Sequence, residues 1–313
     1  MDQNYGTTAI DEYAVDVTWE VADKTDIGVD MRLLNNKLNL QFDYFKESRE
    51  GIYLRRSSIP SYVGMINNPY GNIGKVENKG FELSVNYANS WGGDWSLSLM
   101  GNYSFNRNKV LEDDSTVVYP WQNTIGNKVG QRFGLVALGL FENYGEIAAS
   151  PVETGDTRPG DIKYKDINGD GKIDEYDKVP IGWGSVPEIM YGFGFSVGWK
   201  NLSLTAMFQG AAHVDAMLSG EGVSQGSSRG NLLSNITDRW TEENPRQNAF
   251  YPRLSIGNIN MNYEESTWWL KDTDYLRLKN IELSYRLPDH WMKRIHLDNA
   301  RIFRQGVNLL TFS

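Results

Sequence analysis

The chain has 313 residues, a formal net charge of −9 at pH 7 and no cysteine. Hydrophobic residues make up 40% of it and charged residues 23%, which excludes a disordered chain. The acidic balance argues against nucleic acid as a partner, because neutralising phosphates needs a basic face, and the absence of cysteine excludes disulfides and thiolate metal sites.

The first residues lack the pattern expected of a signal peptide, and the apolar residues do not predict a helical membrane span. Residues 1–16 are polar and acidic, so we expect a signal peptide to be absent. No apolar run approaches the roughly 18 residues of a transmembrane helix. The 31 glycines and 12% aromatic residues instead favour many strands and turns with few helices.

The first predicted elements are two strands near 26–31 and 38–44, joined by a short turn near 34–36. Strands place alternate side chains on opposite faces, so each strand has one apolar and one polar face. A long connection at 48–73 follows. The apolar positions are Ile27, Val29, Met31, Leu38, Leu40, Phe42 and Tyr44.

Two further strands are predicted at 81–87 and 95–106, with a short turn near 89–93. Serine, asparagine and glutamate occupy the positions between their apolar residues, so these strands also have one polar face. The apolar positions are Phe81, Leu83, Val85, Tyr87, Trp95, Leu97, Leu99, Tyr103 and Phe105.

The longest connection, at 108–187, contains the segment KYKDINGDGKIDEYDKV at 163–179. Acidic or amide residues at alternate positions, followed by Gly171 for a sharp turn, give the ligand order of a helix-loop-helix calcium loop, although its last ligand is Asp rather than Glu. A hard divalent cation would relieve the repulsion among four carboxylates; the alternative is a cluster of Asx turns without an ion. The expected ligands are the side chains of Asp166, Asn168, Asp170 and Asp177, the backbone carbonyl of Lys172, and Asp174 directly or through water.

The remaining elements are strands at 189–199 and 202–208, with a two-residue corner at 200–201, and a strand at 274–286 after a long connection at 211–273. In this last strand the apolar parity switches between Leu278 and Ile281, which predicts a bulge near Lys279–Asn280. A turn near 288–298 leads to residues 299–312, whose apolar residues do not define one face.

Half-apolar antiparallel strands fit either a soluble sandwich or a membrane barrel. The predicted strands approach the roughly 9 to 11 residues that cross a bilayer, whereas ordinary strands average about 5 to 6. Every long connection lies at one end, and Trp91, Trp95, Trp199 and Trp291 gather near the short turns, as in an interfacial girdle. The sequence therefore predicts an all-β fold, an antiparallel transmembrane β-barrel segment of about eight strands with long extracellular loops. The alternative is a soluble secreted β-rich calcium-binding or adhesion module.

Several segments resemble signatures of the SusC/RagA family of TonB-linked outer-membrane transporters from Bacteroidetes-type bacteria. They are NIGKVENKGFELSVNY (72–87), PGDIKYKDINGDGKIDEYDKVPIG (159–182), DRWTEENPRQNAFYPRL (238–254) and DYLRLKNIELSYRLP (274–288), and residues 16–45 and 306–313 fit as well. The resemblance implies that residues 1–313 are a partial TonB-dependent-receptor barrel domain, eight strands of a 22-stranded barrel, without the plug that precedes the barrel in the family.

The resemblance also implies a function. Family members import oligosaccharides or peptides across the outer membrane of Gram-negative bacteria, with TonB pulling on the plug and a SusD-like lipoprotein closing over the substrate. We therefore expect no enzyme, and no carboxylate pair in the sequence stands out as a glycosidase site. We expect the calcium loop to be structural and the isolated chain to aggregate, because its two sheet edges would be unpaired.

Histidines and loop tryptophans complete the candidates. His213, His290 and His296 share no metal-ligand spacing and are expected to be solvated. Tryptophans in the outer loops can stack on sugar rings, but packing of the loops is the favoured interpretation. These residues are Trp121, Trp183, Trp268 and Trp269.

Overall fold

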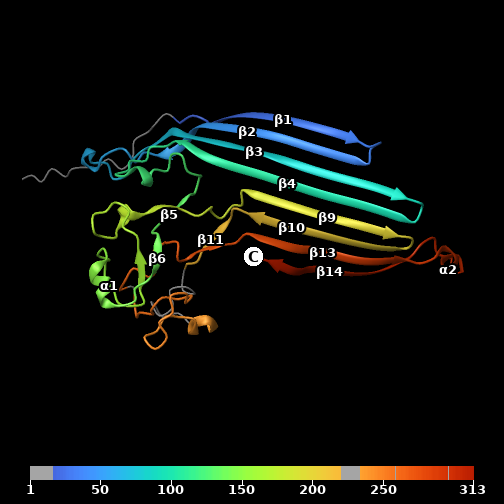
Figure 1. The fold of residues 1–313 in the computed structure, drawn as a ribbon. Coiled ribbons are helices and arrows are strands. Elements are labelled where there is room, and N and C mark those ends of the chain that lie inside the picture. Colours follow the sequence, from blue (N-terminus) through green and yellow to red (C-terminus); the bar gives the residue numbers. More distant parts are fainter. Residues whose placement is uncertain (1–16, 220–232, 258, 295) are drawn as a thin grey trace, which may run out of the picture.

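The computed structural model describes residues 17–219, 233–257, 259–294 and 296–313. The polar stretch 1–16, where the absence of a signal peptide is expected, lies outside the described residues. An eight-stranded antiparallel sheet dominates the described residues, and two long loops fold together at one of its ends (Figure 1). Among the helices of the described segments, none is long and apolar enough to span a membrane.

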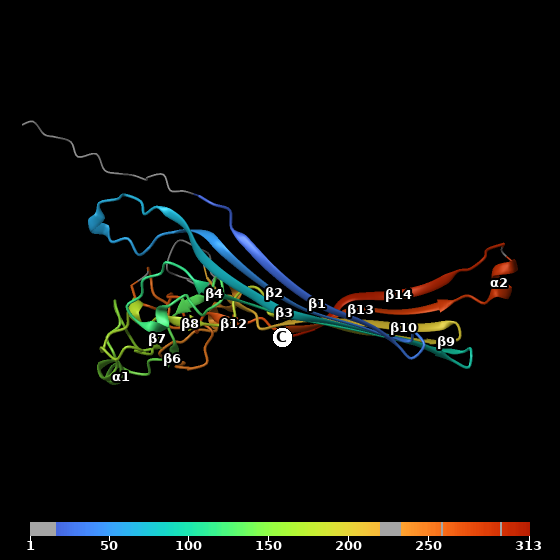
Figure 2. The same ribbon diagram turned by 90° about the horizontal axis from the view of Figure 1, so that it is seen from above.

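The sheet follows the chain order and confirms the prediction of eight strands, with each strand antiparallel to its neighbour. Among the described residues the sheet does not close on itself, since β1 and β14 lie at its two edges. Seen from above, the strands form one curved layer with the loops at one end (Figure 2). The strands are β1 (Val21–Leu33), β2 (Leu38–Arg55), β3 (Tyr70–Trp91), β4 (Trp95–Glu112), β9 (Ile189–Trp199), β10 (Leu202–Ala212), β13 (Tyr275–Arg286) and β14 (Arg301–Phe312).

Short connections join the sheet strands at residues 34–37, 92–94 and 200–201. A fourth, at 287–300, contains the helix α2 (Asp289–Arg294). The long connections are 56–69, 113–188 and 213–274, so β2, β3 and β4 run further than the apolar pattern indicates. Their outer parts are polar and are joined by cross-strand ion pairs, such as Lys46 with Glu77 at 2.8 Å and Lys75 with Glu50 at 2.5 Å. Alternation of apolar residues cannot predict where a strand ends when its outer part consists of charged residues in cross-strand ion pairs.

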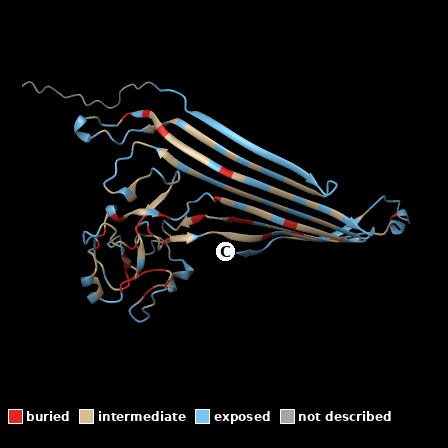
Figure 3. Ribbon diagram, turned by 45° about the horizontal axis from the view of Figure 1, so that its top comes forward, coloured by how far each residue is buried: buried red, intermediate tan, exposed pale blue. Residues whose placement is uncertain are grey.

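The two faces of the sheet differ in the way that the period-two pattern predicts. The large apolar side chains stay exposed on one face, for example Ile27 at 59%, Leu99 at 43% and Leu283 at 50%. The soluble alternative requires these side chains to pack against a second sheet, and among the described residues they do not. Figure 3 accordingly shows the strands mostly exposed or half-buried, while buried segments concentrate in the loops.

The predicted bulge in the strand after the third long loop is confirmed. Phe208 pairs with Leu278 and Met207 with Asn280, so Lys279 is the extra residue. The register also shifts against β14, where Leu278 pairs with Leu310 and Asn280 with Val307, so that here β14 has one residue more than β13. The bulge returns Ile281 to the apolar face.

Residues 113–188 and 213–274 form a compact unit with its own hydrophobic core; we call this unit the loop domain. Its short strands pair as β5 with β8, β6 with β7 and β11 with β12. Core residues come from both loops: Leu135, Leu140, Ile162, Tyr164, Ile173, Trp240, Ala249, Tyr251 and Trp269. The elements of the loops are η1 (Ser61–Val63), η2 (Pro120–Gln122), β5 (Arg132–Gly134), β6 (Ala137–Leu140), α1 (Tyr144–Ala149), β7 (Ile162–Tyr164), η3 (Glu175–Asp177), β8 (Val179–Ile181), β11 (Asp215–Met217), η4 (Ser234–Thr237) and β12 (Leu270–Asp272).

The loop tryptophans pack the loops, as predicted. Trp269 is 2% exposed and its Nε1 donates to the Asn262 carbonyl at 2.7 Å. Trp268 packs against the core, and its Nε1 donates to the Phe250 carbonyl. Trp121 stacks on Tyr119 with ring centroids 4.6 Å apart.

Candidate functional site

The polar face of the sheet forms a continuous wall of small and hydrogen-bonding side chains. One row runs across six strands through directly paired positions. Because side chains at paired positions point to the same face, none of these groups is turned toward the apolar side. The row contains Asp30, Gln41, Ser84, Asn102, Gly192 and Gln209.

This polar wall is hollowed. A cavity of about 560 Å³ lies over β2, β3, β4, β9 and β10, and its polar lining includes Asp43, Glu82, Asn102 and Gln209. Two more hollows, of about 470 and 530 Å³, continue the polar face toward the short turns. They are lined by serines and asparagines such as Ser96, Ser196 and Asn86. The face that offers hydrogen bonds is therefore also the face with room for a solute.

The aromatic residues near the short turns lie at one height on the opposite face. Trp91 pairs with Trp95, and Trp95 pairs with Trp199 in the next strand. Leu202 and Tyr285 extend this row. The three tryptophans are about half exposed, at 47%, 52% and 47%. A belt of amphipathic rings at a constant height is most stable at the boundary between hydrocarbon and water.

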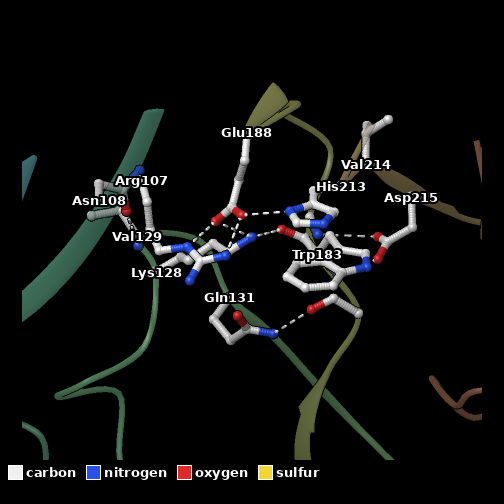
Figure 4. A network of polar contacts seen from close by, with 12 residues as sticks. Arg107, Asn108, Lys128, Val129, Gln131, Trp183, Glu188, His213, Val214 and Asp215 are labelled. Carbon is white, nitrogen blue, oxygen red and sulfur yellow. Dashed lines mark hydrogen bonds and ion pairs between the residues drawn. The ribbon is translucent and has the colours of Figure 1, made fainter. Parts of the chain in front are cut away.

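At the other end of the wall, a buried carboxylate joins the sheet to both long loops (Figure 4). Glu188, just before β9, accepts hydrogen bonds from Arg107 Nε and Nη2 at 2.8 and 2.6 Å. Lys128 Nζ lies 2.8 Å from the same carboxylate, and His213 Nδ1 lies 3.1 Å from it. We call these four residues the Glu188 network. Burial alone would raise the pKa of Glu188, but its hydrogen bonds to Arg107, Lys128 and His213 outweigh burial and lower the pKa to about 2.

The prediction that all three histidines are solvated is wrong for His213. Its ring stacks on Trp183 with centroids 4.0 Å apart and planes 2° apart, and it contacts Glu188. His290 and His296 are exposed, as expected. No spacing in the sequence marks Arg107, Lys128 and Glu188 as neighbours, because they lie far apart along the chain.

A second carboxylate supports the same junction. Asp215, 4% exposed, accepts hydrogen bonds from the backbone N–H groups of Trp183 and Gly184 and from Arg132 Nη1 at 2.7 Å. Trp183 and Arg132 belong to the connection 113–188, whereas Asp215 belongs to the connection 213–274. The two loops are therefore held together directly above the polar wall.

The segment predicted as a calcium loop forms a tight turn whose acidic side chains already face inward. Asp166 accepts hydrogen bonds from the N–H groups of Gly169 and Gly171 at 2.6 and 2.8 Å. Gly171 has φ +82°, which a residue with a Cβ rarely adopts. Asp177 is fully buried and accepts from the N–H groups of Ile167 and Asp174 at 2.7 and 2.9 Å.

The oxygen donors of this loop are chemically suited to a hard cation. In the described parts of the chain, no three carboxylate, histidine or cysteine side chains converge in a way that would hold a metal ion by themselves. The four predicted carboxylate ligands are therefore not gathered around one point in this structure. The other two predicted donors, the Asn168 amide and the Lys172 carbonyl, are typical calcium ligands. Asp170 and Asp174 each accept a backbone N–H, from Lys172 at 2.9 Å and from Tyr176 at 2.8 Å.

The calcium-loop segment is tied into the loop domain. Val152 bonds on both sides of Lys172, donating to the Gly171 carbonyl and accepting from the Ile173 N–H, each at 2.9 Å. The side chain of Ile173 lies in the loop core. Trp121 Nε1 donates to the Tyr176 carbonyl at 2.8 Å. Order in this segment is therefore coupled to order in the loop domain.

Two buried acids lie beside the loop core. Asp161 accepts a two-point contact from Arg253, with both distances 2.9 Å, and a bond from Asn262 at 2.8 Å, so its charge is fully compensated. Glu153 accepts the Tyr164 N–H at 3.1 Å. Burial raises the pKa of Glu153 to about 8, opposed by the Tyr164 N–H and reinforced by the nearby Asp161.

Comparisons with known proteins agree on one family. A family model described as TonB dependent receptor-like, beta-barrel, matches residues 1–308. The chain is 28% identical over 326 residues to TonB-dependent receptor P3 of Formosa agariphila, covering 100% of this chain and 32% of that protein. It is 23% identical to TonB-dependent receptor SusC of Bacteroides thetaiotaomicron, covering 93% of this chain and 28% of that protein.

Solved structures show the same fold. A chain of the RagAB peptide transporter matches with a TM-score of 0.68 and 21% identity, over 95% of this chain and 32% of that chain. The RagAB peptide importer in its open-open state matches with a TM-score of 0.66 and 20% identity, over 100% and 33%. The chain thus spans about a third of the length of the relatives that it matches.

Proposed function

From the premise that this chain belongs to the TonB-dependent receptor-like β-barrel family, we propose that it forms part of the wall and the outer mouth of a SusC/RagA-type importer. Members of this family are outer-membrane transporters, not enzymes. The observation that carries the proposal is the division of the sheet into an exposed apolar face and a hollowed polar face. In this proposal lipid tails contact the apolar face, and water occupies the space beside the polar face.

The cargo that we propose is an oligosaccharide or a peptide. Hydroxyl and amide groups along the wall, such as Ser84, Asn102 and Gln209, replace water around a polar solute and bind it only weakly, so that it moves on. The energy for uptake would come from TonB acting on the rest of the intact protein. The solved RagAB structures are titled as a peptide transporter and importer, which supports this choice of cargo class.

We propose a SusD-like lipoprotein as the partner at the outer end. The loop domain is a folded unit with its own core, held on the wall by the Glu188 network, and so presents a defined surface. A partner that closes over the mouth needs such a rigid rim.

Uptake in cells tests the proposed function. Cells that carry the intact gene, cells that lack it and complemented cells receive fluorescent oligosaccharides and peptides. We expect accumulation that depends on the gene and stops when the proton-motive force is collapsed. Equal accumulation with and without the gene would refute import.

We further propose that Ca²⁺ binds to Asp166, Asn168, Asp170, Lys172, Asp174 and Asp177 and has a structural role. A bound cation would supply positive charge to four carboxylates, and the buried Asp177 would close the site. Affinities of extracellular calcium modules are typically about 10⁻⁴ to 10⁻³ M, so millimolar calcium is the relevant range.

Calcium titration of the intact protein tests this site. We expect millimolar Ca²⁺ to release or absorb heat and to protect residues 163–179 from protease. The variant Asp170→Asn keeps an oxygen for the Lys172 N–H but removes a charge, and should weaken the effect about tenfold. Asp156→Asn, outside the loop, is the matched control. Absence of both heat and protection in the natural protein would disprove the calcium proposal.

A further inference from the structure

The hollow of about 560 Å³ in the polar wall contains an apolar element that transport of a uniformly polar solute does not explain. Met190 and Met207 both line it, and they are 55% and 37% exposed. Met190 lies two residues before Gly192 on β9, and Met207 lies opposite Gly194 on β10. The methionines therefore stand at the two ends of a glycine floor.

The glycine floor keeps this position open. A Cβ at Gly192 would come within 2.6 Å of Asn102 Oδ1, and a Cβ at Gly194 would come within 3.1 Å of Met207 Cγ. Any side chain there would displace these neighbours and fill the hollow. Met100, on the other neighbouring strand, also borders Gly194.

The polar lining of the hollow includes amides, carboxylates, the hydroxyl groups of Ser84 and Ser104, and the side chain of Lys279. Asn102 and Gln209 flank Gly192 on its two neighbouring strands and offer amide donors and acceptors. Asp43 and Glu82 lie directly opposite each other on β2 and β3 and line the same hollow. Like charges at directly opposite positions destabilise a sheet.

This carboxylate pair is unlike the other acids of the same strands. Glu47, Glu50 and Glu77 each form an ion pair with a lysine or arginine. Within the described residues, neither Asp43 nor Glu82 is ion-paired with a cationic side chain. A cationic group of a solute in the hollow would relieve their repulsion.

We propose that this hollow is a contact site for a basic, amphipathic oligopeptide. An aliphatic side chain of the peptide lies over Gly192 between Met190 and Met207, since flexible, polarisable methionine adapts to side chains of different shape. Asn102 and Gln209 bond its backbone amides, and Asp43 and Glu82 receive a lysine or arginine side chain. This inference rests on the proposed import function and narrows its cargo class.

Binding of four fluorescent probes to the intact transporter tests the site. The probes are hexapeptides of alternating Leu and Lys, Leu and Ser, and Ser and Lys, and maltohexaose as the sugar. Fluorescence anisotropy should rank the Leu-Lys peptide as the tightest binder. A sugar that binds more tightly than all three peptides would overturn the assignment.

Two double variants separate the apolar contact from the charged contact. Met190→Gln with Met207→Gln should weaken both leucine peptides about tenfold and leave the Ser-Lys peptide within twofold. Asp43→Asn with Glu82→Gln should weaken both lysine peptides about tenfold and leave the Leu-Ser peptide unchanged. An equal effect of either pair on all probes, or no effect, would contradict the proposal.

Controls separate local effects from misfolding and from failure of the import proposal. Met190→Leu with Met207→Leu should bind as the natural protein does, and Glu142→Gln, an exposed substitution in the loop domain, should change nothing. A difference in migration between unheated and heated protein in detergent gels verifies that each variant forms a barrel. If cells import maltohexaose but none of the peptides, the import proposal is supported and the proposed peptide site is refuted. If no probe accumulates in an energy-dependent way, the proposed import function itself is refuted.

Discussion

Glu188 connects segments that are remote in the sequence, and this explains why it could not be identified from the sequence. Its partners Arg107, Lys128 and His213 come from a strand end and from two different loops. His213 was expected to be solvated because the three histidines share no metal-ligand spacing, whereas its environment is set by Trp183 from the other loop. The residues predicted as calcium ligands, in contrast, lie within twelve residues of one another, so the sequence alone could suggest them as a group.

Neutralising Glu188 should loosen the loop domain. In Glu188→Gln the cations Arg107 and Lys128 lose their shared carboxylate, and we expect a destabilisation of about 2 kcal/mol, as is typical of hydrogen bonds to charged groups. Limited proteolysis of the intact protein should show faster cleavage within 113–188. The control Glu175→Gln alters a side chain that is 79% exposed and should cleave at the natural rate. Equal rates for both variants would count against the network.

Glu153 should make the stability of the loop domain depend on pH. Burial raises its pKa to about 8, so the folded state holds a proton that the unfolded chain releases near pH 4.5. This contribution to stability is complete below about pH 4.5 and is lost as the pH rises through about 8, at about 1.4 kcal/mol per unit at most. Glu153→Gln should flatten the dependence of protease resistance on pH between these values, while the exposed Glu142→Gln should not. An unchanged profile in Glu153→Gln would show that this carboxyl is not responsible.

At the scale of the strands, a period of two was enough to identify seven of the eight members of the sheet and the bulge at Lys279. The ends of β2, β3 and β4 were not predictable, since their outer parts are stabilised by ion pairs such as Lys46 with Glu77. Residues 299–312 did not reveal a face because β14 changes register near Asn308, which has φ +53°. Pairing with β13 decides its faces.

An arginine should cost more folding free energy on the apolar face of β3 than on its polar face. Leu83→Arg puts a cation on the apolar face and should make the free energy of folding less favourable by about 2–4 kcal/mol. Refolding from denaturant into lipid vesicles measures this free energy. Asn86→Arg places the same side chain on the polar face and should cost less than about 1 kcal/mol. Similar costs for the two variants would contradict the assignment of the faces.

At the scale of the molecule, two kinds of packing coexist. The loop domain buries a core that alternation along strands cannot reveal, because Leu135 and Ile162 of one loop meet Trp240 and Trp269 of the other. The sheet, in contrast, leaves its apolar face and both edge strands exposed. The loop domain thus resembles a soluble fold, whereas the sheet depends on lipid and on further strands.

The isolated chain should therefore fail to behave as a soluble protein. Purified residues 1–313 should aggregate in buffer and, reconstituted in vesicles, should transport no peptide or sugar, since β1 and β14 have unpaired edges in the described structure. Size-exclusion chromatography and a vesicle uptake assay measure both properties. A monodisperse monomer with a sharp unfolding transition would contradict this expectation.

The most direct test asks which face of the sheet meets lipid. The chain has no cysteine, so single cysteines at each position from 81 to 87 in the intact protein can carry a nitroxide label. In membranes, labels at Phe81, Leu83, Val85 and Tyr87 should collide mainly with oxygen dissolved in lipid, and labels at the three positions between them with a water-soluble nickel complex. The reverse alternation, or none, would contradict the account of this chain as the wall of a transport pore.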